Sequence, residues 1–256
     1  MTEVILKTSL GKLNCRYSHS LNINAPVAII VGSNTVDFEA KKKMYEDATN
    51  ALFDVFVKNG FSTLEFNFRQ VKSDKKDLDE DTINLLDLTA VLDWLHTKNI
   101  ESKGFWVCGI DVGAFSALHL VMRRPEIENY ILLSPIIKRN DLSFVVPCTA
   151  SGLLVRAGED LRFLEEDCLS LQEKLITKTE SKIKYITIYK AERNFDTEIE
   201  QLKNEISNYI KEKIYEDYKN LRLTKANKRR RRKKRVVEDE KISYLNPIKS
   251  LDIDNI

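Results

Sequence analysis

The stretch "CGIDVGAFSA", residues 108–117, lies where a predicted strand turns sharply into a predicted helix. The apolar run "GFWVCGI" (104–110) ends in this stretch, and residues 112–123 continue from it with helical periodicity. Gly109, Gly113 and Ala114 are small, as close packing of a strand against the following helix requires. Asp111 stands between the glycines, and Asp tolerates the positive φ of such a turn better than most residues. The stretch predicts a strand–turn–helix unit with Asp111 at its apex.

Strand-like and helix-like segments alternate on both sides of this unit. The remaining predicted strands cover residues 25–32, 62–68, 130–135, 151–158 and 183–189, and the remaining predicted helices cover 38–59, 82–98, 163–177 and a segment that starts near 197. Such alternation predicts an α/β fold, a doubly wound and mostly parallel sheet whose functional groups lie at the carboxyl ends of the strands. "VILKTS" and "LNCRYS" flank a short turn and predict an N-terminal β-hairpin. Residues 136–150 are too few for a cap domain.

Charge is unevenly distributed along the 256 residues. The net charge is only +2, yet residues 221–256 hold 12 Lys and Arg against 5 Asp and Glu, whereas residues 1–220 hold 29 against 34. We therefore expect a folded domain over residues 1–220 and a basic, flexible tail over residues 221–256.

Targeting and cofactor signals are weak in this sequence. The N-terminus does not resemble a signal peptide, and no apolar run approaches the 18 residues of a transmembrane segment. The four cysteines have no metal-like spacing, and neither a phosphate-binding glycine loop nor a dinucleotide fingerprint is present. We expect a soluble cytoplasmic protein with reduced thiols and without a cofactor or metal.

Four segments together resemble the small, lidless α/β-hydrolases related to dienelactone hydrolases. They are "NGFSTLEFNFRQVKS" (59–73), "AVLDWL" (90–95), "CGIDVGAFSALHLVMRRPEIENYILLSP" (108–135) and "LSFVVPCTASGLLVRAGEDLRF" (142–163). The resemblance extends over roughly residues 1–215. It implies an α/β-hydrolase fold in which a nucleophile elbow, a base and an acid form a catalytic triad.

The sequence departs from that family at the positions that perform the chemistry. The elbow is normally Gly-x-Ser-x-Gly, but Asp111 occupies the place of the serine. The loop "KAERNF" places Arg193 where the family has its histidine base, while Asp160 in "GEDLRF" keeps the acid position. "GSNT" (32–35) replaces the family's His-Pro-His-Pro turn, which helps to build the oxyanion site.

These departures leave several functions open. The chain is expected to be a pseudoenzyme that binds an unknown small ligand or protein, or acts as a scaffold, with Asp111 shaping the turn and pairing with Arg193. Alternatively, Asp111 is the nucleophile of a weak hydrolase, as aspartate is in haloalkane dehalogenases and epoxide hydrolases. The covalent ester would then need a base, and a guanidinium stays protonated. Histidines are found only at positions 19, 96 and 119, none of which follows the last strand.

The basic tail contains a continuous run of eight positive charges, "KRRRRKKR". Its residues are Lys228, Arg229, Arg230, Arg231, Arg232, Lys233, Lys234 and Arg235. Such a run is typical of a solvated tail or of a segment that binds a polyanion, either nucleic acid or an anionic membrane surface. No aromatic residue lies inside the run to stack on bases.

Overall fold

The computed structural model describes residues 1–32, 38–69, 78–136, 142–176, 182–220 and 222. The chain divides into two compact units, Met1–Tyr209 and Ile210–Ile256. The sheet and the residues around Asp111 belong to the first unit, and the end of the terminal helix belongs to the second. The division expected between residues 220 and 221 stays a prediction.

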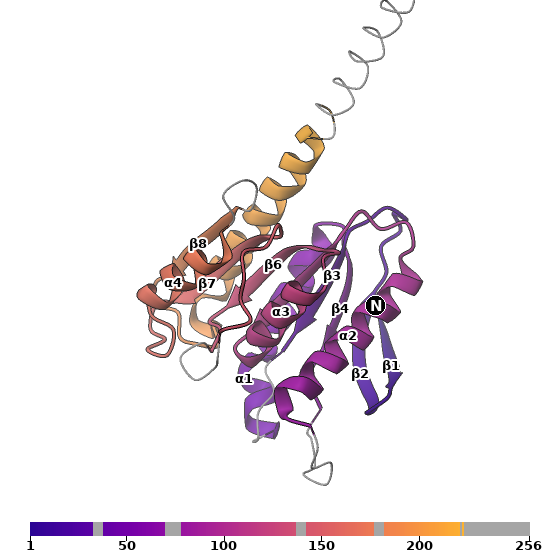
Figure 1. Ribbon diagram of the computed structural model, residues 1–256, viewed down its shortest axis with the longest axis horizontal. Helices are drawn as coiled ribbons and strands as arrows, with labels where there is room; N and C mark the ends of the chain where they lie inside the picture. Colours follow the sequence, from indigo (N-terminus) through magenta and orange to yellow (C-terminus); the bar gives the residue numbers. More distant parts are fainter. Residues whose placement is uncertain (33–37, 70–77, 137–141, 177–181, 221, 223–256) are drawn as a thin grey trace, which may run out of the picture. The chain divides into compact units, whose positions relative to one another are not determined.

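The first unit contains an eight-stranded, mostly parallel sheet with the order β1-β2-β4-β3-β5-β6-β7-β8 (Figure 1). Strands β3 to β8 run parallel to one another, whereas β1 and β2 form the antiparallel N-terminal hairpin that the sequence predicts, and β2 pairs antiparallel with β4. The strands are β1 (Thr2–Thr8), β2 (Gly11–Ser18), β3 (Val27–Val31), β4 (Ser62–Phe66), β5 (Phe105–Ile110), β6 (Ile127–Leu133), β7 (Ser151–Ala157) and β8 (Ile183–Ile188). The predicted fold class is confirmed.

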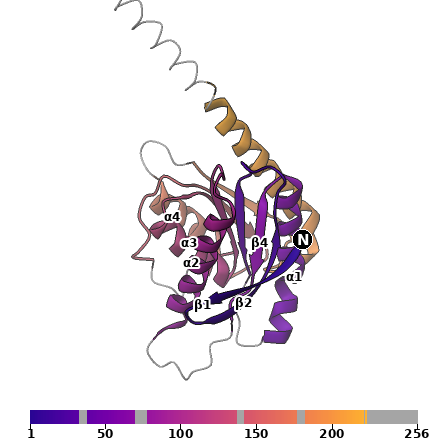
Figure 2. The same ribbon diagram turned by 90° about the vertical axis from the view of Figure 1, so that its right-hand side faces the viewer.

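Helices cover both faces of the sheet. Figure 2 shows α2, α3 and α4 on one side of it and α1 on the other. The helices are α1 (Phe38–Lys58), α2 (Glu80–Lys98), α3 (Val112–Arg123) and α4 (Glu165–Leu175), followed by the 3-10 turn η1 (Asp196–Glu198) and a helix over residues 199–220. Within the first unit, Tyr209 of this last helix contacts the ring of Trp106.

Burial explains why these segments adopt their structure. Every residue of β3 is fully buried, as expected for a central strand that helices cover on both faces. Leu88, Val91 and Leu95 of α2 are also fully buried, because their spacing places them on one face of that helix. The helix begins where the Asp79 carboxylate accepts a hydrogen bond of 2.7 Å from the Thr82 N–H.

Strand β6 begins at Ile127, three residues before the predicted start at residue 130. Ile127 pairs with Phe105 of β5, and the exposed Glu128 that follows it interrupts the apolar run by which the sequence marks a buried strand. Between β6 and β7, the described residues 134–136 and 142–150 form neither helix nor strand.

The four cysteines, Cys15, Cys108, Cys148 and Cys168, are free thiols. Burial raises the pKa of Cys15 and of Cys168 to about 12, so both remain protonated at neutral pH. Among the described helices, none is long and apolar enough to cross a lipid bilayer.

Candidate functional site

The β5–α3 turn, residues 109–114, brings strand and helix backbones into close contact. A Cβ atom on Gly109 would overlap the backbone of Gly113 and Ala114, and one on Gly113 would overlap the carbonyl oxygens that end β3. Asp111 adopts φ 56° and ψ −114°, a conformation that costs a non-glycine residue free energy. Its backbone N–H donates a hydrogen bond of 3.0 Å to the Leu133 carbonyl. Steric packing therefore fixes both the shape of the turn and the position of Asp111.

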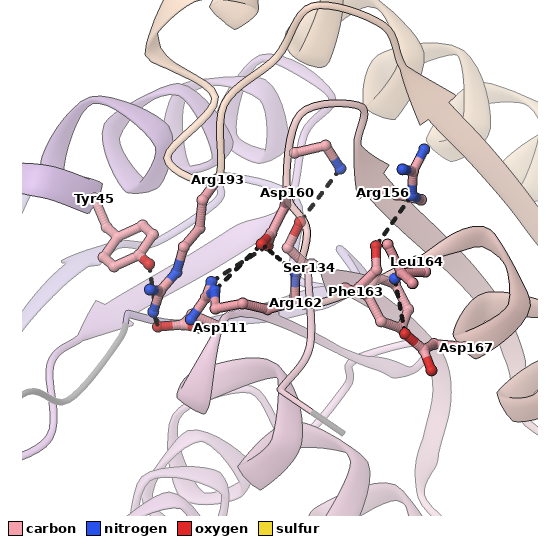
Figure 3. A network of polar contacts seen from close by, with 11 residues as sticks. Tyr45, Asp111, Ser134, Arg156, Asp160, Arg162, Phe163, Leu164, Asp167 and Arg193 are labelled. Carbon is pink, nitrogen blue, oxygen red and sulfur yellow. Dashed lines mark hydrogen bonds and ion pairs between the residues drawn. The ribbon is translucent and has the colours of Figure 1, made fainter. Parts of the chain in front are cut away.

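The Asp111 carboxylate is fully buried and accepts hydrogen bonds at both oxygens (Figure 3). Tyr45 Oη donates to Asp111 Oδ2 over 3.1 Å, and Arg193 Nη2 donates to the same oxygen. Arg162 Nη1 donates to Oδ1 over 3.4 Å. Two guanidinium groups and a phenol thus surround one carboxylate at the carboxyl end of β5.

The loop after β8 directs Arg193 toward Asp111. Phe195 is fully buried, and its N–H closes a turn on the Glu192 carbonyl at 2.8 Å. Thr197 Oγ1 donates to the Lys190 carbonyl and fixes the end of the loop. The Arg193 guanidinium also lies 5.6 Å from the centre of the Tyr45 ring. The pairing of Asp111 with Arg193 that the sequence predicts is present in the structure.

Asp160 lies in the turn after β7 and binds Arg162. Its Oδ1 accepts hydrogen bonds from the Arg162 backbone N–H at 3.0 Å and from Nε at 3.2 Å, and its Oδ2 accepts one from Nη2 at 3.2 Å. Arg162 therefore bridges the two aspartates. In a triad the acid orients the base, whereas here Asp160 orients an arginine that lies two residues after it.

Sequence reasoning missed Arg162 and Tyr45. In "GEDLRF" the spacing of Asp160 and Arg162 in a turn was a usable signal, because such a turn can fold one side chain back onto the other. Tyr45 had no comparable signal, since nothing in the sequence relates this residue of α1 to Asp111, 66 positions away. We call Tyr45, Asp111, Asp160, Arg162 and Arg193 the Asp111 network.

The Asp111 network balances two carboxylates with two guanidinium groups. Burial, followed by the negative charge of Asp111, raises the pKa of Tyr45, so its hydroxyl remains a donor at neutral pH. Arginine stays protonated in proteins and cannot remove a proton from water or a hydroxyl group. The network can bind and orient charged groups, but neither Arg162 nor Arg193 can act as a general base.

The three histidines contact residues outside the Asp111 network. His19 Nδ1 lies 2.7 Å from Tyr17 Oη, and His96 Nε2 lies 3.5 Å from Glu126 Oε1. The His119 ring stacks on Phe144 with 3.6 Å between ring centroids, and burial lowers the pKa of His119. Each ring is thus packed or paired away from Asp111.

A polar cavity of about 500 Å³ lies next to Tyr45, between α1 and strands β1, β2 and β4. Arg16 and Glu65 pair in its lining, and Glu3 and Glu46 add negative charge. Burial, opposed in part by Arg16, raises the pKa of Glu65. The cavity offers a ligand several hydrogen-bonding side chains beside the network.

Two predicted features lie outside the described residues. They are positions 33–35 of the "GSNT" turn and the basic run 228–235. In the part of the chain that the structure describes, no three His, Cys, Asp or Glu side chains gather where they could bind a metal ion.

Proteins similar to this chain include ones with an α/β-hydrolase fold. No family model matches the sequence. The chain is 28% identical over 214 residues to the uncharacterized protein RP471 of Rickettsia prowazekii, a match that covers 82% of this chain and 89% of RP471. It is 33% identical to ATU1826 of Agrobacterium tumefaciens, a protein of unknown function described as a putative α/β-hydrolase, with a TM-score of 0.73 and coverage of 84% and 97%.

A third similar protein is XC6422 of Xanthomonas campestris, described as an α/β serine hydrolase without a lid. Identity is 18%, the TM-score is 0.65, and the match covers 82% of this chain and 94% of XC6422. At this identity the likeness concerns the fold alone.

Proposed function

The chain belongs to the α/β-hydrolase superfamily, and we propose that it is a pseudoenzyme of that superfamily that serves as a binding or scaffold protein. In this proposal the nucleophile, base and acid positions of a lidless hydrolase hold Asp111, Arg193 and Asp160. The closer relationship to dienelactone hydrolases, and the loss of the triad, belong to the proposal too.

One observation carries it: both oxygens of the buried Asp111 carboxylate accept hydrogen bonds from cationic side chains. A serine nucleophile needs a base to take its proton, and a carboxylate nucleophile needs a base to activate the water that hydrolyses its covalent ester, but a guanidinium cannot take a proton. Hydrogen bonds from two guanidinium groups also stabilise the carboxylate and so weaken it as a nucleophile. This argues against the alternative in which Asp111 attacks an ester or alkyl substrate.

A binding role needs a place for the ligand. The cavity beside Tyr45 adjoins the Asp111 network and is lined by carboxylate, amide and guanidinium groups. Its acidic lining suits a small ligand that carries positive charge or several hydrogen-bond donors. A cytoplasmic location and a role without a cofactor remain predictions.

Turnover of short activated esters tests the loss of catalysis. We expect the wild-type protein and Asp111→Ala to release product at the same rate as buffer. The double variant Asp111→Ser, Arg193→His restores a serine and a histidine at the two positions and serves as the matched gain-of-function control. Turnover by the wild-type protein that disappears in Asp111→Ala would show that Asp111 is a working nucleophile. A covalent adduct on Asp111, found by mass spectrometry after incubation with an alkylating substrate, would show the same.

The basic run supports a second proposed function, polyanion binding. Eight consecutive positive charges attract phosphate-rich partners by counterion release, in a way that is salt-sensitive and largely independent of sequence. Deleting residues 226–256 should abolish retention on a nucleic-acid column at low salt. Undiminished retention would exclude the tail as its cause.

A further inference from the structure

At the end of the described helix, residues 211–220 and 222, the carboxylates lie on a different face from two of the cationic side chains. At 100° per residue, the side chains of Lys211, Tyr215, Tyr218 and Arg222 fall within about 60° of one another around the helix axis. We call these four residues the tyrosine stripe. The carboxylates of this segment, Glu212, Glu216 and Asp217, lie outside that arc, and Glu216 pairs with Lys213 at 3.1 Å. One side of the helix therefore carries aromatic rings and positive charge without a carboxylate.

The rings of the tyrosine stripe are open to solvent. Tyr215 is 68% exposed and Tyr218 is 56% exposed, whereas most aromatic side chains of the core are buried. The Arg222 guanidinium lies 5.5 Å from the centre of the Tyr218 ring, so a cation flanks an exposed aromatic face. Lys211 and Arg222 themselves are exposed. Exposed tyrosines framed by cations combine the two features by which proteins bind single-stranded nucleic acid.

From this arrangement we infer that the tyrosine stripe binds single-stranded nucleic acid by stacking bases on Tyr215 and Tyr218. The inference rests on the polyanion binding proposed above and adds aromatic side chains on which bases can stack. The run 228–235 contains no aromatic residue, but it begins only six residues after Arg222 in the sequence. One strand can therefore contact the stripe through its bases and the run through its phosphates.

Two other polyanions fit the stripe less well. A duplex keeps its bases stacked inside, where exposed tyrosines cannot reach their faces. A membrane-binding helix inserts an apolar face rich in Leu, Phe and Trp, and the tyrosine stripe has none of these residues. The described aliphatic side chain beside it, Ile214, is 41% exposed and covers too little area to anchor a helix in lipid.

The experiment measures binding of the full-length protein to a labelled single-stranded oligonucleotide by fluorescence anisotropy. Tyr215→Leu with Tyr218→Leu removes both rings, and Tyr215→Phe with Tyr218→Phe keeps them. Because stacking contributes about 1–3 kcal/mol per base, we expect the Leu variant to bind at least about tenfold more weakly and the Phe variant within about twofold of the wild type. Tyr189→Leu removes another exposed tyrosine, 74% exposed and in the first unit, and serves as the matched control, with no expected change.

Each arm of the experiment separates the two proposals. If the Leu variant binds like the wild type while deletion of residues 226–256 abolishes binding, the stacking inference is wrong and polyanion binding stands. If the deletion changes nothing, polyanion binding through the tail is wrong. Weakened binding of the Leu variant to anionic phospholipid vesicles or to a duplex, by the same factor, would also overturn the inference, because it would show that the tyrosines do not recognise unstacked bases.

Discussion

The β5–α3 turn and the Asp111 network share Asp111 but are determined by different forces. Main-chain contacts determine the turn: Gly109 and Gly113 lie where a single added carbon would overlap neighbouring backbone. Side chains from distant segments form the network: Tyr45 comes from α1, and Arg162 and Arg193 come from the loops after β7 and β8. Close backbone packing therefore determines the shape of this turn independently of the side chains that surround Asp111.

Gly113→Ala tests whether backbone packing determines the turn, and it has the largest expected effect on stability. The added Cβ meets the carbonyl oxygens of Val31 and Gly32, so β3 and α3 must separate. We expect a loss of about 3 kcal/mol in the free energy of unfolding, measured by urea denaturation.

Gly60→Ala is the control for this prediction. Gly60 has φ +86°, but a Cβ there has no atom within 4 Å. Its cost should be limited to backbone strain, about 1–2 kcal/mol. Gly113 has no positive φ, so a loss in Gly113→Ala no greater than that in Gly60→Ala would contradict close packing as the reason for glycine in the turn.

Arg193→Met tests the contribution of charge in the Asp111 network, and we expect an intermediate effect on stability. It leaves the Asp111 carboxylate buried with Arg162 at 3.4 Å and Tyr45 as hydrogen-bond partners. Since the Arg193 side chain is 26% exposed, we expect a loss of about 2 kcal/mol, below the usual cost for a fully buried pair.

The double variant Asp111→Asn, Arg193→Met also removes the buried negative charge that Arg193 helps to neutralise, and it should recover part of that loss. Lys203→Met breaks the exposed pair with Glu200 and should change stability by less than about 0.5 kcal/mol. No recovery in the double variant would contradict an ionic role for Arg193.

Tyr45→Phe has the smallest expected effect at neutral pH, about 1 kcal/mol, because one hydrogen bond to Asp111 is lost. The pH dependence is more informative. Burial and Asp111 raise the pKa of Tyr45 in the folded state, whereas an unfolded tyrosine ionises near pH 10. The contribution of Tyr45 is therefore complete below about pH 10 and is lost as the pH rises further, by up to about 1.4 kcal/mol per pH unit.

The free energies of unfolding of wild type and Tyr45→Phe, measured by urea denaturation from pH 7 to pH 11, check this expectation. The advantage of the wild type should shrink above about pH 10 and then reverse. A constant difference across that range would show that the Tyr45 hydroxyl ionises equally in both states.

The sequence predicted the architecture well because the architecture depends on local patterns. The apolar runs that predicted β3 and β5 are buried in the structure, and so are the helically spaced apolar residues of α2. The small residues of the β5–α3 turn lie where backbones are in close contact. Strand β6 was predicted too short because its first residues pair with β5 without an apolar run. Pairing of this kind depends on the neighbouring strand and leaves no local signal.

The candidate site was predictable only in part. The resemblance identified Asp111, Asp160 and Arg193, and the structure brings all three into one network. It did not identify Arg162, whose guanidinium links the two aspartates, or Tyr45, whose helix is distant in the sequence. The tyrosine stripe was equally hidden, because helical periodicity predicts a common face but not which faces remain exposed.

The sequence separations within the Asp111 network have a consequence for how the chain folds. Asp111 is bonded to partners 66, 51 and 82 positions away in the chain, on both its N-terminal and C-terminal sides. Contacts of such high order close large loops and form only after the strands on both sides of β5 have assembled. The network therefore forms late in folding. Its loss should raise the unfolding rate more than it lowers the folding rate.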